Sequence, residues 1–239
     1  MTDAELAALV RRADPDRFIG ALFAPPERRR WLLTLYAFNH ELARAREVAH
    51  SAPLALIRLH WWREVVEGAT RDHPVANLVR EAIGAGALDP VALAALVDAR
   101  EAEAEPIAGG AAFMAYVRGT TGGLGRMAGR CLGVDDAAGL GCLDDLGTGY
   151  GIVAILRAGD ALRAHGRVLL PEDAGVLRDL PDIARVLLAN RPPRAALAAA
   201  LPAVLARRDL QRVRRGDPMR PRSLGDRLAV IAAGLSGRM

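Results

Sequence analysis

Arginines provide most of the side chains in this chain that could bind a ligand. All 32 basic residues of the sequence are arginine and none is lysine. A guanidinium group binds carboxylate and phosphate oxygens in a bidentate manner, so arginine suits anionic ligands better than lysine does. Arg58, Arg157 and Arg167 are the strongest candidates for binding an anion, although each could equally hydrogen-bond the last carbonyl groups of a helix.

Acidic residues, cysteines and histidines show no spacing typical of a metal site. Asp98, Glu101 and Glu105 lie at helical spacings, which fits a metal site on one helix face or, more simply, solvent-exposed pairing with nearby arginines. Cys131 and Cys142 form neither a metal-binding pattern nor a disulfide framework, which indicates buried thiols in a reducing compartment. The histidines also lack ligand spacing; they are His40, His50, His60, His73 and His165. We therefore predict no metal ligands.

Length and composition predict a single all-helical domain. The chain has 239 residues, of which 51% are hydrophobic, so it can bury a sizeable core. Alanine, leucine and arginine dominate, and runs of Val, Ile and Thr of strand length are missing. No linker-like segment divides residues 1–239, and residues 191–239 are expected to form basic C-terminal helices of the same domain.

Three predicted helices contain most of the candidate residues. The first ends near residue 50, and its inward face is expected to consist of Leu32, Leu35, Tyr36, Ala43 and Glu47. The second begins after Ser51 as N-cap, and its apolar stripe consists of Leu54, Ile57, Trp61, Trp62 and Val65. The third covers residues 136–165, with a stripe of Leu140, Leu143, Leu146, Tyr150, Val153 and Arg157.

The remaining helices are placed by caps, prolines and glycines. We expect helices at residues 3–13, after a capping box of Thr2 and Glu5, and then from about residue 14, at 72–83 and at 89–105. Residues 111–132 form a glycine-rich helix that a second helix can approach closely. Three further helical stretches are expected from Pro181 onward.

Two sequence runs in the first two of these helices resemble the squalene/phytoene synthase family. They are YAFNHELARAR, which begins at Tyr36, and IRLHWWREVVEG, which begins at Ile57. Catalytic members of that family carry the run Tyr-Ala-Phe-x-Arg-x-x-Asp-Asp-x-x-Asp, whose carboxylates hold magnesium against a prenyl diphosphate. In this chain the three acidic positions fall on Ala43, Arg44 and Glu47, so one carboxylate of three remains.

A third run, YGIVAILRAGDALRAHGRVLLPED, resembles the second family motif. Catalytic members show Gln-x-x-Asn-x-x-Arg-Asp-x-x-x-Asp followed by Gly-Arg-x-Tyr-Leu-Pro. The positions that match are Arg157, Gly166, Arg167, Leu170 and Pro171. The glutamine and asparagine positions fall on Gly151 and Ala154, and both aspartate positions fall on apolar residues, Ala158 and Leu162.

The resemblance implies an isoprenoid-synthase-type helical bundle around a central cavity, without the residues for its usual chemistry. Glu47 beside Arg44 cannot hold a magnesium cluster alone, and Asp160 is more simply an arginine partner or a solvated residue than a replacement ligand. We predict no catalytic residue, no metal site and no cofactor; magnesium would be needed only for a prenyltransferase. The side chains expected at the cavity or binding an anion are Tyr36, Asn39, His40, Arg44, Glu47, Arg58, Trp61, Tyr150, Arg157 and Arg167.

The replacements favour one branch of the family. The pattern GxxYGIVxxLRAxxxxxxxGRxxLP, Asn39 after YAF and residues 97–101 look like the branch that acts in assembly of respiratory complex I and lacks the aspartate-rich motifs. This implies a non-catalytic assembly factor whose partner is a complex I subunit or the inner-membrane surface. Two alternatives stay open: a head-to-head prenyltransferase in isoprenoid biosynthesis, and a binding protein whose Arg44 meets the anionic head of an isoprenoid, quinone or lipid.

Charge is concentrated at the C-terminal end. Residues 191–239 contain eleven arginines against Asp209, Asp217 and Asp226, a balance of +8, whereas residues 1–190 carry 21 arginines against 25 acidic residues, a balance of −4. Such a segment fits a solvated helix face, an anionic membrane surface or an acidic partner. Nucleic acid is not expected, because no aromatic residues accompany the arginines. No charge-free run approaches the ~18 to 20 residues of a membrane span, so we predict a cytoplasmic protein with at most peripheral membrane contact.

Overall fold

All regular structure that the computed structural model describes is helical. The described residues are 1–49, 51–217 and 221–239, so the prediction for His50 lies outside them. In chain order the α-helices are α1 (Asp3–Ala13), α2 (Pro15–Ala21), α3 (Pro26–Val48), α4 (Ala52–Val66), α5 (Pro74–Gly84), α6 (Pro90–Glu101), α7 (Gly109–Val117), α8 (Gly123–Cys131), α9 (Ala137–Ala164), α10 (Ala174–Leu188), α11 (Leu197–Ala200), α12 (Pro202–Arg214) and α13 (Leu224–Ser236). The all-α prediction is confirmed.

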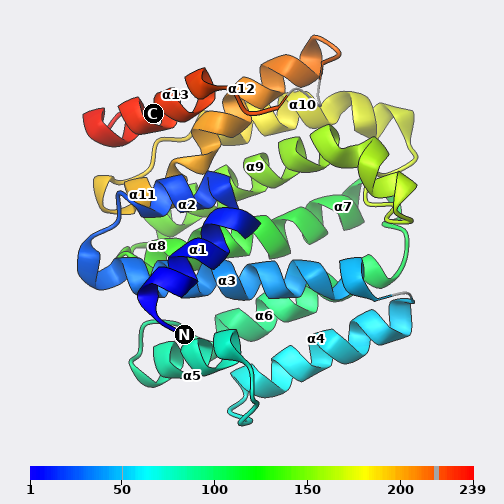
Figure 1. Ribbon diagram of the computed structural model, residues 1–239. Coiled ribbons are helices and arrows are strands. Elements are labelled where there is room, and N and C mark those ends of the chain that lie inside the picture. Colours follow the sequence, from blue (N-terminus) through cyan, green and yellow to red (C-terminus); the bar gives the residue numbers. More distant parts are fainter. Residues whose placement is uncertain (50, 218–220) are drawn as a thin grey trace.

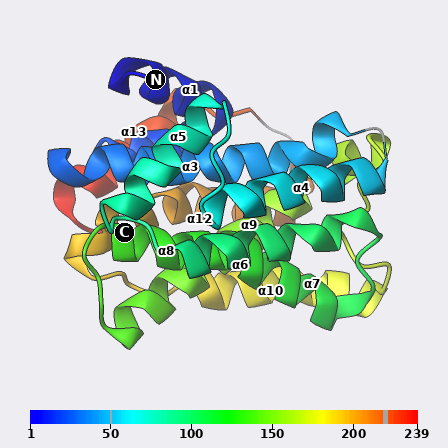
Figure 2. The same cartoon turned by 90° about the horizontal axis from the view of Figure 1, so that it is seen from below.

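The long helices α3 and α9 form the centre of the fold (Figure 1). α8 lies between them and packs against both. On the outer side of α3, α4 and α5 pack against it and against each other (Figure 2). On the outer side of α9 lie α10 and α12, and α13 packs on α12. The two motif-bearing helices are therefore held on either side of a shared core.

Caps and prolines start most helices where the sequence places them. The capping box at α1 is present, with Thr2 N–H donating to Glu5 Oε2 at 2.7 Å and Glu5 N–H donating to Thr2 Oγ1 at 3.3 Å. The prediction was wrong for α10, which begins at Ala174 and contains Pro181 within it. Asp173 explains this start, because its Oδ1 accepts from the N–H groups of Gly175 at 2.7 Å and Val176 at 3.0 Å.

The apolar stripe predicted for α4 is partly wrong. Leu54 and Ile57 are exposed, and Trp61 is only partly covered. The buried face consists instead of Ala55, Leu59, Trp62, Val65 and Val66, because α3, α5 and α6 all pack on that side. Ser51 does occupy the N-cap position, although its side chain makes no capping hydrogen bond within the described residues. α4 therefore presents apolar side chains to solvent.

The glycine-rich segment forms one helical run that packs against α9. It consists of α7, a π-helical turn (Arg118–Gly122) and α8. Gly125 lies against the backbone of Leu143, and Gly147 lies against the backbone of Thr121. A side chain at either glycine would collide with the facing helix. The absence of a side chain therefore allows the close approach that the sequence predicts. α9 is itself long and apolar enough to span a membrane, but 56% of its most apolar stretch is buried here, as expected of a core helix.

Candidate functional site

The C-terminal ends of α3 and α9 form the walls of a surface groove of about 660 Å³. Its lining residues are Arg46, Glu47, Ala49, Ala158, Ala161, Leu162, His165, Gly166 and Arg167. Three of the five positions at which catalytic family members carry aspartates therefore lie on this groove: Glu47 on α3, and Ala158 and Leu162 on α9. The two sequence motifs meet in space as their register predicts.

Arg167 joins the groove to a buried ion-pair cluster. Its Nη1 donates to Glu47 Oε1 at 3.2 Å, and its Nη2 donates to Glu103 Oε2 at 2.5 Å. Glu103 lies in a 3-10 turn after α6, and its Oε1 also accepts from Arg100 Nη1 and from the hydroxyl of Tyr116, both at 2.7 Å. We call Asn39, Arg100, Glu103, Tyr116 and Arg167 the Glu103 cluster; Asn39 belongs to it because its Oδ1 accepts from Arg100 Nη2 at 3.2 Å.

The electrostatics of the Glu103 cluster keep its carboxylate ionised. Burial by itself would raise the pKa of Glu103, but the charges and hydrogen bonds of Arg100 and Arg167 hold that pKa below its ordinary value. Burial also raises the pKa of the Tyr116 hydroxyl well above its ordinary value, so Tyr116 remains a hydrogen-bond donor at neutral pH. Two arginines therefore neutralise Glu103, and one of them also neutralises Glu47.

These residues do not fit a magnesium site. Mg²⁺ needs several oxygen ligands in near-octahedral order, and the groove offers only Glu47, which is already paired with Arg167. Arg44 does not line the groove; its Nη1 instead donates to Glu41 Oε1 at 3.4 Å. Nowhere in residues 1–49, 51–217 and 221–239 do three or more His, Cys, Asp or Glu side chains gather in a way that could hold a metal ion. A diphosphate held through metal ions therefore has no ligand set here.

The interior between α3 and α9 is largely filled, so the central cavity that the family resemblance implies is small. The cavity lined by Arg17, Tyr36 and Tyr150 has a volume of only about 20 Å³, room for roughly one water molecule. Arg17 of α2 fills the space: its guanidinium carbon lies 4.6 Å from the ring centre of Tyr150 and 6.0 Å from that of Tyr36. Its Nη1 also donates to Asp14 Oδ2 at 2.6 Å, so the buried charge is paired.

Tyr36, which is buried, and Tyr150, which is partly buried, are therefore packing partners of Arg17. Burial, the largest influence on each, raises both tyrosine pKa values well above the ordinary value, and both hydroxyls stay protonated. For Arg17, burial would lower the pKa, but Asp14 and the two tyrosines raise it overall. The sequence does not single out Arg17, because an arginine in the first turn after Asp-Pro-Asp has the pattern of an ordinary surface residue.

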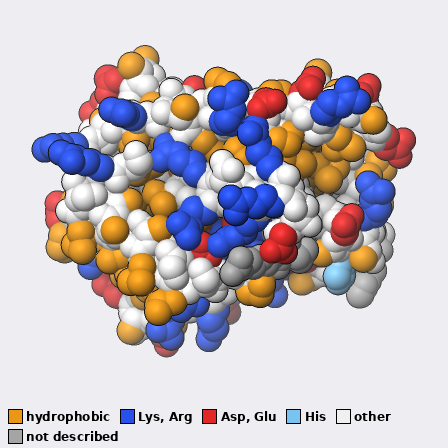
Figure 3. Space-filling model, turned by 90° about the horizontal axis from the view of Figure 1, so that it is seen from above, with side chains coloured by type: hydrophobic (Ala, Val, Ile, Leu, Met, Phe, Trp, Pro, Cys, Tyr) orange, Lys and Arg blue, Asp and Glu red, His pale blue; other side chains and the backbone are white. Residues whose placement is uncertain are grey.

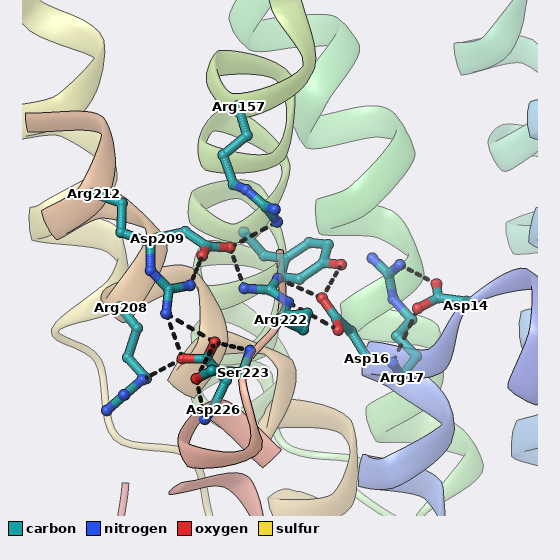
Figure 4. A network of polar contacts seen from close by, with 11 residues as sticks. Asp14, Asp16, Arg17, Arg157, Arg208, Asp209, Arg212, Arg222, Ser223 and Asp226 are labelled. Carbon is teal, nitrogen blue, oxygen red and sulfur yellow. Dashed lines mark hydrogen bonds and ion pairs between the residues drawn. The ribbon is translucent and has the colours of Figure 1, made fainter. Parts of the chain in front are cut away.

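Arg157 belongs to a second polar network, which lies beside α9 and α12 (Figure 4). Its Nη1 donates to Asp209 Oδ2 of α12 at 3.0 Å. Arg222, which precedes α13, donates to the same Asp209 oxygen at 2.6 Å and to Asp16 Oδ2 of α2 at 2.5 Å. The network thus connects α2, α9, α12 and the start of α13. Arg157, predicted to bind an anion, pairs with a carboxylate of its own chain.

The other predicted residues lie elsewhere. Arg58 and Trp61 line a separate pocket of about 280 Å³ on α4, together with Glu41, Ile57, Trp62 and His73. His40 lines neither this pocket nor the groove. Asp98 is paired with Arg63, and Glu101 and Glu105 are exposed, so these acidic residues form no site together.

Comparisons with known proteins agree with the arrangement of the motifs. Residues 10–182 match a family model described as squalene/phytoene synthase. The chain is 29% identical over 174 residues to "NADH dehydrogenase (ubiquinone) complex I, assembly factor 6" of Rattus norvegicus and 28% identical over 182 residues to the protein of that name of Homo sapiens. These matches cover 70% and 74% of this chain but 52% and 55% of those proteins, so the chain spans about half the length of these curated relatives.

Solved structures of two synthases share the fold. A dehydrosqualene synthase in complex with ligand superposes with a TM-score of 0.77 at 14% identity, over 98% of this chain and 95% of that one. Squalene synthase from Alicyclobacillus acidocaldarius gives a TM-score of 0.64 at 16% identity, over 97% and 94% of the two chains. Identities this low establish a common fold only. With the family model covering most of its length, the chain belongs to the squalene/phytoene synthase family.

Proposed function

We propose that this protein is a non-catalytic family member that assists assembly of the respiratory NADH:quinone oxidoreductase, complex I. The relatives named as complex I assembly factors support the choice of partner. The side chains that line the groove support a protein without prenyl transfer activity, because they do not fit a magnesium site. Fold alone would not decide between helper and enzyme, because one fold hosts many functions.

The main observation behind the proposal is that Glu47 is paired with an arginine of its own chain. It is the one family carboxylate retained at the groove, and Arg167 pairs with it at 3.2 Å. Across the groove, Ala158 and Leu162 contribute no oxygen ligands. A synthase must neutralise a diphosphate leaving group, and these side chains have no means of doing so through metal ions.

A gene deletion in the source organism tests the role in assembly. We expect NADH:quinone oxidoreductase activity in the membranes to fall, while succinate-dependent respiration stays unchanged as the control for membrane integrity. Wild-type protein and the Glu47→Gln variant should both restore the activity. Intact complex I in the deletion strain would refute the proposal. Failure of Glu47→Gln alone would show that the carboxylate has a chemical role and would contradict a non-catalytic function.

An enzyme assay tests the prenyltransferase alternative directly. Purified protein is incubated with farnesyl or geranylgeranyl diphosphate, magnesium and NADPH, and hydrocarbon products are extracted. We expect none. A product that forms with the wild type and disappears with Glu47→Gln would overturn the proposal, since Glu47 would then act in the reaction.

A second candidate function is binding of an anionic head group at the groove. Arg46 and Arg167 both line the groove, and Nε of Arg167 is buried without a hydrogen-bond partner in the described part of the chain. A phosphate oxygen could satisfy such a donor directly. Calorimetric titration with geranyl diphosphate in the absence of magnesium tests this. Binding should weaken in Arg46→Gln and persist in Arg58→Gln, whose side chain lies in the other pocket; no heat with the wild type would exclude this function.

A further inference from the structure

The outward face of α13 is apolar along its whole length. Leu224, Leu228, Ile231 and Leu235 follow one another at spacings of four, three and four residues, which places them on one side of the helix. They are 72%, 54%, 38% and 78% exposed. The opposite side already packs into the protein through Asp226, Val230 and Ala233, so the exposed stripe is not needed for folding.

Positive charge accompanies this stripe. Arg227 is exposed on α13 beside Leu224 and Leu228, and Arg238 is exposed directly after the helix. Within residues 221–239 the one acidic side chain is Asp226, which is fully buried. Arg208 and Arg212 of α12 both donate to it, and its pKa is held well below the ordinary value by these bonds and the Ser223 cap despite its burial. The surface of α13 therefore carries side-chain charge of one sign.

The neighbouring surface is also rich in arginine. Figure 3 looks onto the side of the molecule that carries α12 and α13; arginines gather over its middle, and hydrophobic and some acidic side chains lie beside them. Arg208 is 45% exposed in its side chain, and Arg215 at the end of α12 is exposed. The one acidic residue in α12, Asp209, is buried among Arg157, Arg212 and Arg222, whereas Asp217, just after this helix, is exposed.

We propose that the outward face of α13 docks this protein on an anionic lipid bilayer, with α13 lying in the plane of the membrane surface. Leucine and isoleucine side chains would enter the boundary between head groups and acyl chains, while Arg227, Arg238 and Arg208 bind lipid phosphates. An anionic bilayer fits better than a partner protein for two reasons. α13 is an outer helix of the fold, so its stripe faces away from the rest of the protein, and the exposed charges of α13 are complementary to a uniformly negative surface.

Co-sedimentation with lipid vesicles tests the proposal. Purified protein is mixed with vesicles of phosphatidylcholine alone or with phosphatidylglycerol added, at low and high salt. We expect binding to the anionic vesicles only, and weaker binding at high salt because screening acts on the arginine contacts. The assay contains only protein and lipid, so its failure leaves the complex I proposal standing.

Paired variants make the test specific to α13. Leu228→Ser combined with Leu235→Ser should reduce partitioning at least about tenfold, since each leucine loses apolar burial in the bilayer. Val91→Ser combined with Val186→Ser, which removes exposed apolar side chains from α6 and α10, should bind like the wild type. Arg227→Gln combined with Arg238→Gln should lose the preference for anionic lipid. Circular dichroism of each variant confirms that it is folded.

Three results would overturn the proposal. The first is wild-type protein that stays in the supernatant with anionic vesicles. The second is a leucine double variant that binds as well as the wild type. The third is a wild-type dimer that the leucine double variant converts to a monomer. In that case the stripe is an interface between two copies of this chain.

Discussion

Replacing Glu103 by glutamine tests whether the Glu103 cluster is an ion-pair core of the fold. Its side chain is 3% exposed and accepts from Arg100, Arg167 and Tyr116. Glutamine keeps the shape but removes the charge, which leaves the buried Arg100 without a carboxylate and Arg167 with only Glu47. Removing one partner of a buried ion pair costs about 3 to 5 kcal/mol in unfolding free energy.

Two variants in the same cluster calibrate this value. Tyr116→Phe removes one hydrogen bond to a charged group, which is worth about 1.5 to 3 kcal/mol. Glu47→Gln removes a carboxylate that is 51% exposed and bonds to the same Arg167, so we expect about 1 kcal/mol or less. The predicted order of destabilisation is therefore Glu103→Gln, then Tyr116→Phe, then Glu47→Gln.

Urea denaturation and thermal melting measure these differences. For a chain of this length each kcal/mol shifts the melting temperature by about 2 to 4 °C, so Glu103→Gln should melt about 6 to 20 °C below the wild type. The reasoning is refuted if Glu103→Gln lies within about 1 kcal/mol of the wild type. It is also refuted if Glu47→Gln costs as much as Glu103→Gln, because burial would then not determine the strength of these pairs.

Three further predictions concern acidity, the C-terminal network and helix packing. The pKa values of Glu103 and Asp226 are lowered in the folded state. Their contribution to the free energy of unfolding is therefore complete above the unfolded-state pKa of about 4 and is lost as the pH falls below it. In an acid titration, Asp226→Asn should lose stability less steeply than the wild type. Arg222→Gln leaves Asp16 and the buried Asp209 with fewer partners and should destabilise the protein by about 2 to 4 kcal/mol. Limited proteolysis of this variant should cut the C-terminal helices first. A variant as resistant to protease as the wild type would contradict the role of the network. Gly125→Ala places a methyl group against the α9 backbone and should cost about 1 to 3 kcal/mol, whereas Gly141→Ala, where the space is open, should be neutral or stabilising in the same melting experiment.

The sequence predicts the helices well where local signals define them. Caps, prolines and apolar periodicity place α1, α3, α5 and α9 close to their observed bounds, whereas α6 ends at Glu101, before the expected residue 105. The sequence does not predict the start of α10 correctly, because Pro181 is typical of a helix start but lies inside this helix, whose N-cap is Asp173. Which face of α4 is buried could not be read from the sequence, since both faces are apolar and only the positions of α3, α5 and α6 decide between them.

The candidate site was predictable in register but not in detail. Motif spacing brings Glu47, Ala158 and Leu162 to one groove, as expected. The acidic residue that binds Arg167 in the interior is Glu103, whereas the helical spacing in the sequence pointed to Glu101 and Glu105. A 3-10 turn follows α6 and changes which side chain faces inward, so helical spacing fails at that point. Whether the central cavity is open could not be decided from the sequence, because Arg17, which fills it, comes from α2, outside both motifs.

The small space around Arg17 limits what this protein can recognise. A hydrocarbon tail could enter the centre only if α2 swung away, which would strip Arg17 of its tyrosine neighbours and would pull Asp16 from Arg222. We therefore expect ligands or partners to bind at the protein surface. Substitutions that impair this protein should fall into two groups: those that loosen the packing around Arg17 and those that alter exposed side chains.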